Sequence, residues 1–263
     1  MSSPWILLRG LTRESRHWGG FAPLLEARCG PVLQVDLPGN GTLAHVRSPL
    51  AVEDYVDAVR AEVQRLGARA PYKVLAMSLG GMVATAWAQR YPDELAQLVL
   101  INTSMRPFSR FYERLRPAAW PALLRAAWHW QASGGDVVAE AAIHRRTCAR
   151  RDTLAADLDT WRAIRASAPV SRGNAIRQLL AAARYTARGV PRCPTLVLSS
   201  QADRLVDPVC SERLARAWGA VQREHPWAGH DLPHDDPQWL ADAVCAASPP
   251  SDAIPAARNH AAG

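Results

Sequence analysis

Short apolar segments alternate with longer amphipathic segments along most of this chain, and that alternation is the strongest constraint on its fold. The apolar segments are nearly continuous in hydrophobic character, which is typical of strands covered on both faces in a parallel sheet. The expected strands are Trp5–Leu8, Pro31–Asp36, Tyr72–Ala76, Leu98–Asn102, Thr195–Ser200 and Ala220–His225. The expected helices are Ser15–Arg28, Pro49–Leu66, Leu79–Arg90, Pro208–Trp218 and Pro237–Ala246. This order predicts an α/β fold with a mostly parallel sheet of about six strands flanked by helices.

One long segment interrupts the alternation. Residues 104–189 carry helical patterns rich in Arg, Ala and Trp and no strand signal. We therefore expect a helical cap inserted over the sheet edge where open α/β sheets bind ligands. Residues 1–103 and 190–246 are then the predicted core. The tail, residues 247–263, has no periodicity and is expected to be disordered.

Composition excludes several classes of protein. The net charge is +7, but Lys73 is the only lysine, so 30 of the 31 cationic side chains are arginine. We interpret this bias as codon usage rather than nucleic-acid binding. No apolar run approaches the roughly 20 residues that span a bilayer, and the first residues lack the basic start of a signal peptide. We predict a cytoplasmic protein with no nucleic-acid partner and no membrane span.

The cysteines give no sign of a disulfide framework or a metal site. They are odd in number and widely scattered, at positions Cys29, Cys148, Cys193, Cys210 and Cys245. No Cys-x-x-Cys spacing occurs among them. We expect free, buried thiols in a reducing compartment.

The strongest chemical signal is the segment Ala76-Met77-Ser78-Leu79-Gly80-Gly81. It directly follows an expected strand and opens an expected helix, so Ser78 lies on a tight strand-to-helix turn. Such a turn brings together the residues two before and two after the serine, and Ala76 and Gly80 are small enough for it. This pattern is a nucleophile elbow with Ala in place of the first Gly.

A serine hydroxyl needs a base to take its proton and an acid to orient that base. The acid candidate is Asp203, in the loop that leaves an expected strand. Asp207 is its rival, but the following Pro208 indicates that Asp207 caps a helix. The base candidate is His230, between the last expected strand and helix. We expect a packing or hydrogen-bonding role for His234.

Acyl transfer also needs two donors aimed at the oxyanion. The backbone N–H of Leu79, the residue after the nucleophile, is one candidate. The other is the N–H of Leu11, in the loop after the first expected strand, where Gly10 permits a close approach.

These motifs resemble the α/β-hydrolase superfamily. The segments Arg9-Gly10-Leu11, Asp36 to Gly41, Ala76 to Gly81, Asp203 and Gly229-His230 occur in the family's order over about residues 5–246. Within the family, the chain is similar to compact bacterial carboxylesterases of the pimeloyl-acyl-carrier-protein methyl esterase type. The resemblance implies a parallel sheet, a V-shaped helical cap, no metal and no organic cofactor.

The chain departs from this family in three places. Arg9 stands where the family has His before the glycine of the oxyanion loop, so this loop must be braced differently. Ala76 replaces the commoner Gly, which is a mild steric change. The chain also begins at the family's third strand, so we expect the leading hairpin to be absent.

Substrate-contacting residues are harder to predict than catalytic ones. The candidates are Gly10, Met77, Trp120, Trp128 and Trp161. Aromatic side chains of the cap could line an acyl pocket, although packing onto the core is the alternative for each of them. The cap arginines from Arg145 to Arg165 could bind an anionic acyl-carrier or CoA-bound substrate, and a solvated helix face is the alternative.

The sequence thus predicts a serine hydrolase that cleaves carboxylic esters or thioesters, small molecules or carrier-bound, through an acyl-enzyme. The same residues serve carbon–carbon bond hydrolysis, acyl transfer, hydroxynitrile lysis or cofactor-free perhydrolysis. A non-catalytic binding protein is a further alternative, for which Arg9 is the clue. Acyl length, leaving group, pathway and oligomeric state remain open.

Overall fold

The strands form a single parallel sheet. The structure is a computed structural model that describes residues 3–130 and 135–247. Its strand order is β2-β1-β3-β4-β5-β6, and every neighbouring pair is parallel. The strands are β1 (Trp5–Leu8), β2 (Val32–Val35), β3 (Tyr72–Met77), β4 (Leu95–Ile101), β5 (Thr195–Ser200) and β6 (Val221–His225). The predicted α/β fold with a sheet of six parallel strands is confirmed.

Helices cover both faces of this sheet. The α-helices are α1 (Phe21–Cys29), α2 (Val52–Arg65), α3 (Leu79–Arg90), α4 (Phe111–Arg114), α5 (Trp120–His129), α6 (Gly135–Thr147), α7 (Leu154–Ser167), α8 (Arg172–Arg184), α9 (Val209–Trp218), α10 (Leu232–Asp235) and α11 (Pro237–Ala247). Short 3-10 helices are η1 (Ser15–Trp18), η2 (Gly41–Leu43), η3 (Pro92–Glu94) and η4 (Pro117–Ala119).

Strand β1 shows how the core is divided between the two faces. Because side chains alternate along a strand, Ile6 and Leu8 pack with residues of α2, α3 and α9. Trp5 and Leu7 pack on the other face with residues of α1 and α11. All four side chains are fully buried, as expected for a strand inside a parallel sheet.

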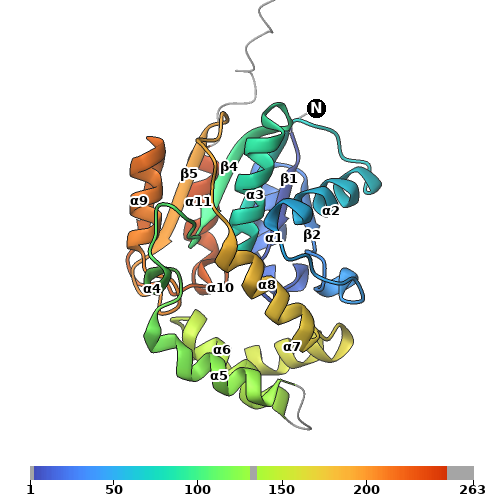
Figure 1. The fold of residues 1–263 in the computed structure, drawn as a ribbon, viewed down its shortest axis with the longest axis vertical. Coiled ribbons are helices and arrows are strands. Elements are labelled where there is room, and N and C mark those ends of the chain that lie inside the picture. The colour runs from blue at the N-terminus through green and yellow to red at the C-terminus, as the bar shows by residue number, and fades with distance from the viewer. Residues whose placement is uncertain (1–2, 131–134, 248–263) are drawn as a thin grey trace, which may run out of the picture.

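The described residues between β4 and β5 form α4 to α8, which we call the cap helices. Figure 1 shows α5, α6 and α7 gathered at the lower end of the molecule, toward which β4 and β5 run. Division of the chain into core and cap at residues 104 and 189 stays a prediction. The predicted disorder of the tail falls, from residue 248 on, outside the described residues.

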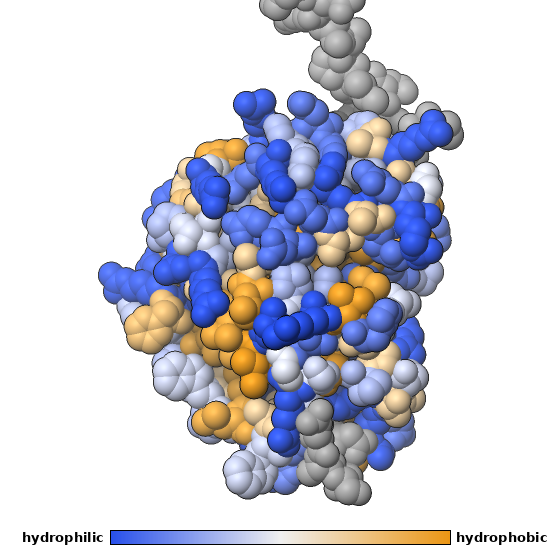
Figure 2. All heavy atoms as spheres, turned by 45° about the vertical axis from the view of Figure 1, so that its right-hand side comes forward, coloured by the Kyte–Doolittle hydropathy of each residue, from blue (hydrophilic) through white to orange (hydrophobic). Residues whose placement is uncertain are grey.

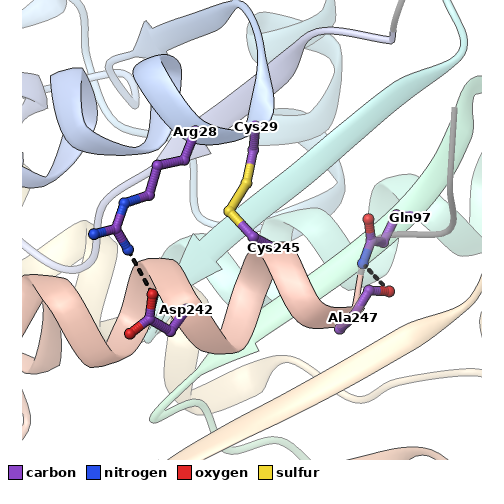
Figure 3. Close-up of a disulfide and its surroundings, with 6 residues drawn as sticks. All are labelled: Arg28, Cys29, Gln97, Asp242, Cys245 and Ala247. Atoms are coloured by element: carbon purple, nitrogen blue, oxygen red, sulfur yellow. Dashed lines mark hydrogen bonds and ion pairs between the residues drawn. A yellow bond between two sulfur atoms is a disulfide. The ribbon is translucent and has the colours of Figure 1, made fainter.

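Strand β4 begins three residues earlier than predicted, at Leu95. The polar side chain of Gln97 ended the apolar pattern in the sequence. In the structure Gln97 is buried, and its amide donates to the carbonyl of Ala247 at the end of α11 (Figure 3). A buried polar group is tolerated in a strand when it is hydrogen-bonded in this way.

The prediction of one helix over Ser15–Arg28 is wrong. The segment forms η1 and α1, separated by Gly19 and Gly20. Gly19 adopts φ 51°, in the left-handed region that glycine tolerates best. The helix pattern therefore continues across a break that only the two glycines signal.

The expectation of free thiols without a disulfide is wrong for Cys29 and Cys245. These two residues form a disulfide between α1 and α11, with Cα atoms 6.0 Å apart (Figure 3). They are 216 positions apart in the sequence, so only the packing of the two helices brings them together. Among the described residues the remaining cysteines are free, at positions Cys148, Cys193 and Cys210. Every described helix is too short or too polar to cross a lipid bilayer.

Candidate active site

Ser78 lies at the turn from β3 to α3 with a strained backbone. Its φ of 54° and ψ of −117° are rare for a residue other than glycine. Two hydrogen bonds to β4 and the residues after it hold this conformation. The Ser78 N–H donates to the carbonyl of Ile101 at 3.0 Å. The hydroxyl of Thr103 donates to the Ser78 carbonyl at 2.8 Å. Ser78 itself is only partly buried, so the turn presents it at the carboxyl end of the sheet.

Glycines allow the oxyanion loop and α3 to approach this turn closely. A Cβ atom on Gly10 would lie 3.0 Å from Ser78 Cβ and 3.5 Å from Ser78 Oγ, which places the predicted oxyanion loop against the serine. A Cβ atom on Gly80 would lie 2.5 Å from the carbonyl oxygen of Arg9 and 2.6 Å from that of Leu8. Leu79, whose N–H is the first predicted oxyanion donor, is the first residue of α3, where N–H groups have no intrahelical acceptor.

We expect Gly80→Ala to destabilise the protein by about 1–3 kcal/mol or more, because the clash is with backbone atoms that cannot rotate away. Gly173, within α8, is the matched control, since its nearest neighbour is a side-chain atom at 3.8 Å. Gly173→Ala should leave the free energy of unfolding unchanged or raise it by about 0.5–1 kcal/mol. Urea unfolding checks both variants. Equal stabilities for the two would contradict the close packing described at Gly80.

Asp203 and His230 lie together at the same end of the sheet. Oδ2 of Asp203 lies 2.7 Å from Nδ1 of His230, and both residues are buried. The other carboxylate oxygen, Oδ1, accepts hydrogen bonds from the N–H groups of Leu205 and Val206 at 2.7 and 2.9 Å. The Asp203 side chain is therefore fixed by its own loop while it faces the imidazole. The described contacts include no direct hydrogen bond between His230 and Ser78 Oγ.

Asp207, the rival acid, makes different contacts. Its Oδ1 accepts the N–H of Val209 at 3.1 Å, at the start of α9. Its other oxygen lies 3.8 Å from Arg116. Asp207 therefore lies in the turn before α9 and is half-exposed, while the N-cap residue of that helix is Pro208 rather than the predicted Asp207.

Arg9 braces the predicted oxyanion loop through a buried ion pair. Its guanidinium donates to both carboxylate oxygens of Asp231, at 3.0 and 2.8 Å. The side chains are 2% and 3% exposed, and Arg9 also lies over the ring of Trp18. Because Asp231 directly follows His230, this pair joins the loop beside Ser78 to the loop that carries the candidate base.

The pair also changes the pKa values of titratable groups near the site. Burial alone would raise the pKa of Asp231, but the charge and hydrogen bonds of Arg9 lower that pKa well below its usual value. The pKa of buried His17 is lowered well below its usual value by desolvation and by the nearby charges of Arg13 and Arg9. The ion pair with Arg9 therefore favours the charged form of the Asp231 carboxyl, and burial favours the neutral form of His17.

Several polar residues that hold the His230 loop were not identified from sequence. The Asn102 amide donates to the carbonyl of His230 at 2.8 Å and to that of Gly229 at 3.3 Å. The carboxylate of Asp235 accepts the Gly229 N–H at 2.7 Å. Arg116 donates to the carbonyl of Asp203 at 2.9 Å. The only sequence signal for Asn102 is its place directly after β4.

The candidate substrate residues occupy different environments. Met77 is buried in the apolar cluster of α1 and α11. Trp161 is 5% exposed and packs against Arg13, at 4.2 Å from ring to guanidinium. Trp120 and Trp128 are 44% and 79% exposed. Substrate contacts of all these residues stay predictions, and for Trp161 the contacts describe packing between cap and core.

Large apolar side chains are exposed on the cap helices. Figure 2 shows hydrophobic side chains gathered in two groups near the middle of one face, with hydrophilic side chains between them. The large exposed apolar residues of residues 104–189 are Phe111, Tyr112, Trp120, Leu124, Trp128, Val137, Ile176, Leu179 and Leu180.

Comparison with known proteins places the chain in a family. The model of the alpha/beta hydrolase family matches residues 5–243. The chain is 30% identical over 223 residues to the pimeloyl-[acyl-carrier protein] methyl ester esterase of Chromobacterium violaceum, which covers 81% of this chain and 83% of that protein.

Solved structures give the same picture. A thermophilic esterase from Thermogutta terrifontis has a TM-score of 0.72 at 25% identity, covering 93% of this chain and 88% of that one. An enol-lactonase from Burkholderia xenovorans has a TM-score of 0.75 at 19% identity, covering 94% of this chain and 91% of the other, a likeness of fold alone.

Proposed function

Since the chain belongs to the alpha/beta hydrolase family and is a hydrolase of the esterase type, we propose that Ser78, His230 and Asp203 are its catalytic triad. The observation that carries the proposal is the 2.7 Å contact between buried His230 and Asp203 at the sheet edge where Ser78 adopts its strained turn. A carboxylate fixed on Nδ1 of a histidine leaves Nε2 as the atom that can accept a proton.

The proposed reaction proceeds in two halves. Ser78 Oγ attacks the ester carbonyl carbon while His230 takes the hydroxyl proton, and the carbonyl oxygen becomes an oxyanion. The N–H groups of Leu79 and Leu11 are the proposed donors to this oxyanion. His230 then protonates the leaving alcohol or thiol, which leaves an acyl group on Ser78. Water, deprotonated by His230, releases the carboxylic acid and regenerates the serine.

The proposed substrates are carboxylic esters or thioesters. The relative from Chromobacterium violaceum is named for the methyl ester of a carrier-bound acyl chain, which makes a carrier-bound ester one candidate. Of the cap arginines first considered, Arg165 is paired with Glu140 at 2.8 Å and is mostly buried. Arg145 and Arg150 are exposed and are better placed for an anionic carrier.

Arg9 no longer favours a non-catalytic binding protein. Arg9 replaces the family's histidine, but its ion pair with Asp231 provides a brace for the loop. We therefore propose an assembled oxyanion site rather than a lost one.

A substrate panel tests the proposed function. Wild-type protein would be assayed on free esters, acyl-carrier-bound esters, thioesters and amides of matched acyl length. We expect turnover of esters or thioesters, with an initial burst of chromogenic alcohol equal to the enzyme concentration if deacylation is slower than acylation. Binding without turnover of any member would support a receptor instead. Turnover confined to an acyl acceptor other than water would support a transferase.

Asp203 and Asp207 offer a matched pair of variants. We expect Asp203→Asn to lower kcat by about 10⁴-fold, because the amide would favour the wrong tautomer of His230. Asp207→Asn should change kcat little, because Asp207 contacts the start of α9. Steady-state kinetics on one ester checks both. A larger loss in Asp207→Asn would mean that the acid is misassigned.

A further inference from the structure

Three residues with metal-ligating side chains meet where the cap helices contact the core. His144 lies in the last turn of α6, Cys148 follows that helix, and His234 lies on α10. One ring nitrogen of each histidine and the sulfur of Cys148 lie within 4.8 Å of one another. His144 and Cys148 are 0% and 2% exposed, so water does not solvate them.

The hydrogen bonds of the two imidazoles leave ligand atoms unused. Oδ2 of Asp157, on α7, lies 2.8 Å from Nε2 of His144 and 2.9 Å from Nε2 of His234. Nδ1 of each ring is buried, and neither has a partner within hydrogen-bond distance. Nδ1 of His234 faces a carboxylate, because Oδ1 of Asp235 lies 3.6 Å from it. Buried polar atoms are paired in most proteins, and an unpaired one costs free energy. His144, Cys148 and His234 therefore offer three neighbouring ligand atoms to one shared partner.

We propose that His144, Cys148 and His234 bind one Zn²⁺ ion, with Asp157 orienting both histidine rings. Imidazole nitrogen and thiolate sulfur are the ligands that zinc prefers. A carboxylate that accepts the other N–H of each ligating histidine is the usual second partner in such sites. Binding would release the thiol proton of Cys148 to solvent, because the thiolate is the ligand.

The site would join the cap helices to the loop of the candidate base. The N–H of Asp231 donates to the carbonyl of Thr147 at 2.7 Å. The carboxylate of Asp235 accepts the N–H groups of Ala149 and Arg150. These bonds already connect the end of α6 to the segment from His230 to Asp235. An ion at His234 would strengthen that connection without touching Ser78, so its binding can be measured independently of esterase activity.

Cobalt substitution tests the proposal. The full chain would be treated with a chelator without reductant, which leaves the Cys29–Cys245 disulfide intact, and then titrated with Co²⁺ and with Zn²⁺. We expect one equivalent of Co²⁺ to bind with a thiolate-to-cobalt charge-transfer band, Zn²⁺ to displace it, and either ion to raise the unfolding temperature. Cys148→Ala should abolish the band. Asp157→Asn should weaken affinity about 10–100-fold.

Cys210→Ala is the matched control, because Cys210 is a buried free cysteine on α9, outside the cluster. Its band and stoichiometry should equal those of the wild type. The absence of a thiolate band in wild-type protein with excess Co²⁺ would overturn the proposal, and this result needs no variant to fold. A band that persists in Cys148→Ala would also overturn it, and its disappearance in Cys210→Ala would then assign it to Cys210. In either case the role of His144 and His234 would be to bond to Asp157 and to pack against Trp161, whose ring lies 5.2 and 5.9 Å from theirs.

Discussion

Ser78→Ala is expected to lower kcat on carboxylic esters by about 10⁴-fold or more, with the fold retained. Alanine keeps the Cβ atom and the same preference against φ 54°, so the backbone strain at the turn is unchanged. Only the nucleophilic oxygen is lost. Steady-state kinetics on a chromogenic ester, together with circular dichroism of the variant, measures the effect.

Ser211→Ala provides the control for this experiment. Ser211 is a buried serine on α9 and belongs to no part of the proposed catalytic machinery. Its kcat should remain close to that of the wild type. If Ser78→Ala retained near-wild-type kcat while folded, the chemistry would belong to another residue.

Arg9→Ala is expected to destabilise the protein by about 3–5 kcal/mol, because it leaves the Asp231 carboxylate buried without its counter-charge. Activity should fall as well, since the pair joins the loop beside Ser78 to the loop of His230. Denaturant unfolding and kinetics measure the two effects. Arg90→Ala is the control, because Arg90 pairs with Asp57 in an exposed position and its loss should leave the unfolding midpoint unchanged.

The double variant Arg9→Met with Asp231→Leu separates two roles of the ion pair, its contribution to stability and its positioning of the two loops. Apolar replacement of a buried ion pair often restores stability. We expect a recovered unfolding midpoint with kcat still reduced, because the bidentate geometry that positions the loops is gone. Full recovery of kcat would show that the pair only fills space. An unchanged stability in Arg9→Ala would contradict the buried pair itself.

The lowered pKa of Asp231 predicts how its contribution depends on pH. A carboxyl whose folded pKa lies below its unfolded value stabilises the protein above the unfolded pKa, about 3.9, and loses that contribution as pH falls further. The stability difference between wild type and Asp231→Asn should therefore be constant from about pH 7 to 5 and shrink below about pH 4. Urea unfolding across this range checks it. A difference that shrank between pH 7 and 5, or persisted undiminished at pH 3, would contradict the lowered pKa.

Local patterns in the sequence predicted the elements that depend on local physics. β1 and β5 occur at the predicted residues, as does α3 after Ser78. The strand-turn-helix context pointed to Ser78, and the placement of Asp203 and His230 after strands explains why they lie at one edge. The first residues of β4, around Gln97, were missed because the sequence alone does not show whether a polar residue is buried or exposed.

Contacts between distant segments were not predictable in this way. The sequence indicated that the loop at Arg9 must be braced differently, but the residue that braces it, Asp231, is 222 positions away and no pattern links the two. The disulfide of Cys29 and Cys245 likewise depends on how α1 and α11 pack. The brace, the disulfide and the cluster at His144 all arise from tertiary packing.

The central claim is that the oxygen of Ser78 is the nucleophile, and covalent labelling tests it most directly. Wild-type protein would be inactivated with a serine-directed alkyl phosphonate, digested and examined by mass spectrometry. We expect one phosphonyl group per chain, on the peptide that contains Ser78, with esterase activity lost in proportion to labelling. Complete inactivation with the label on another residue, or full labelling of Ser78 with activity retained, would contradict the account.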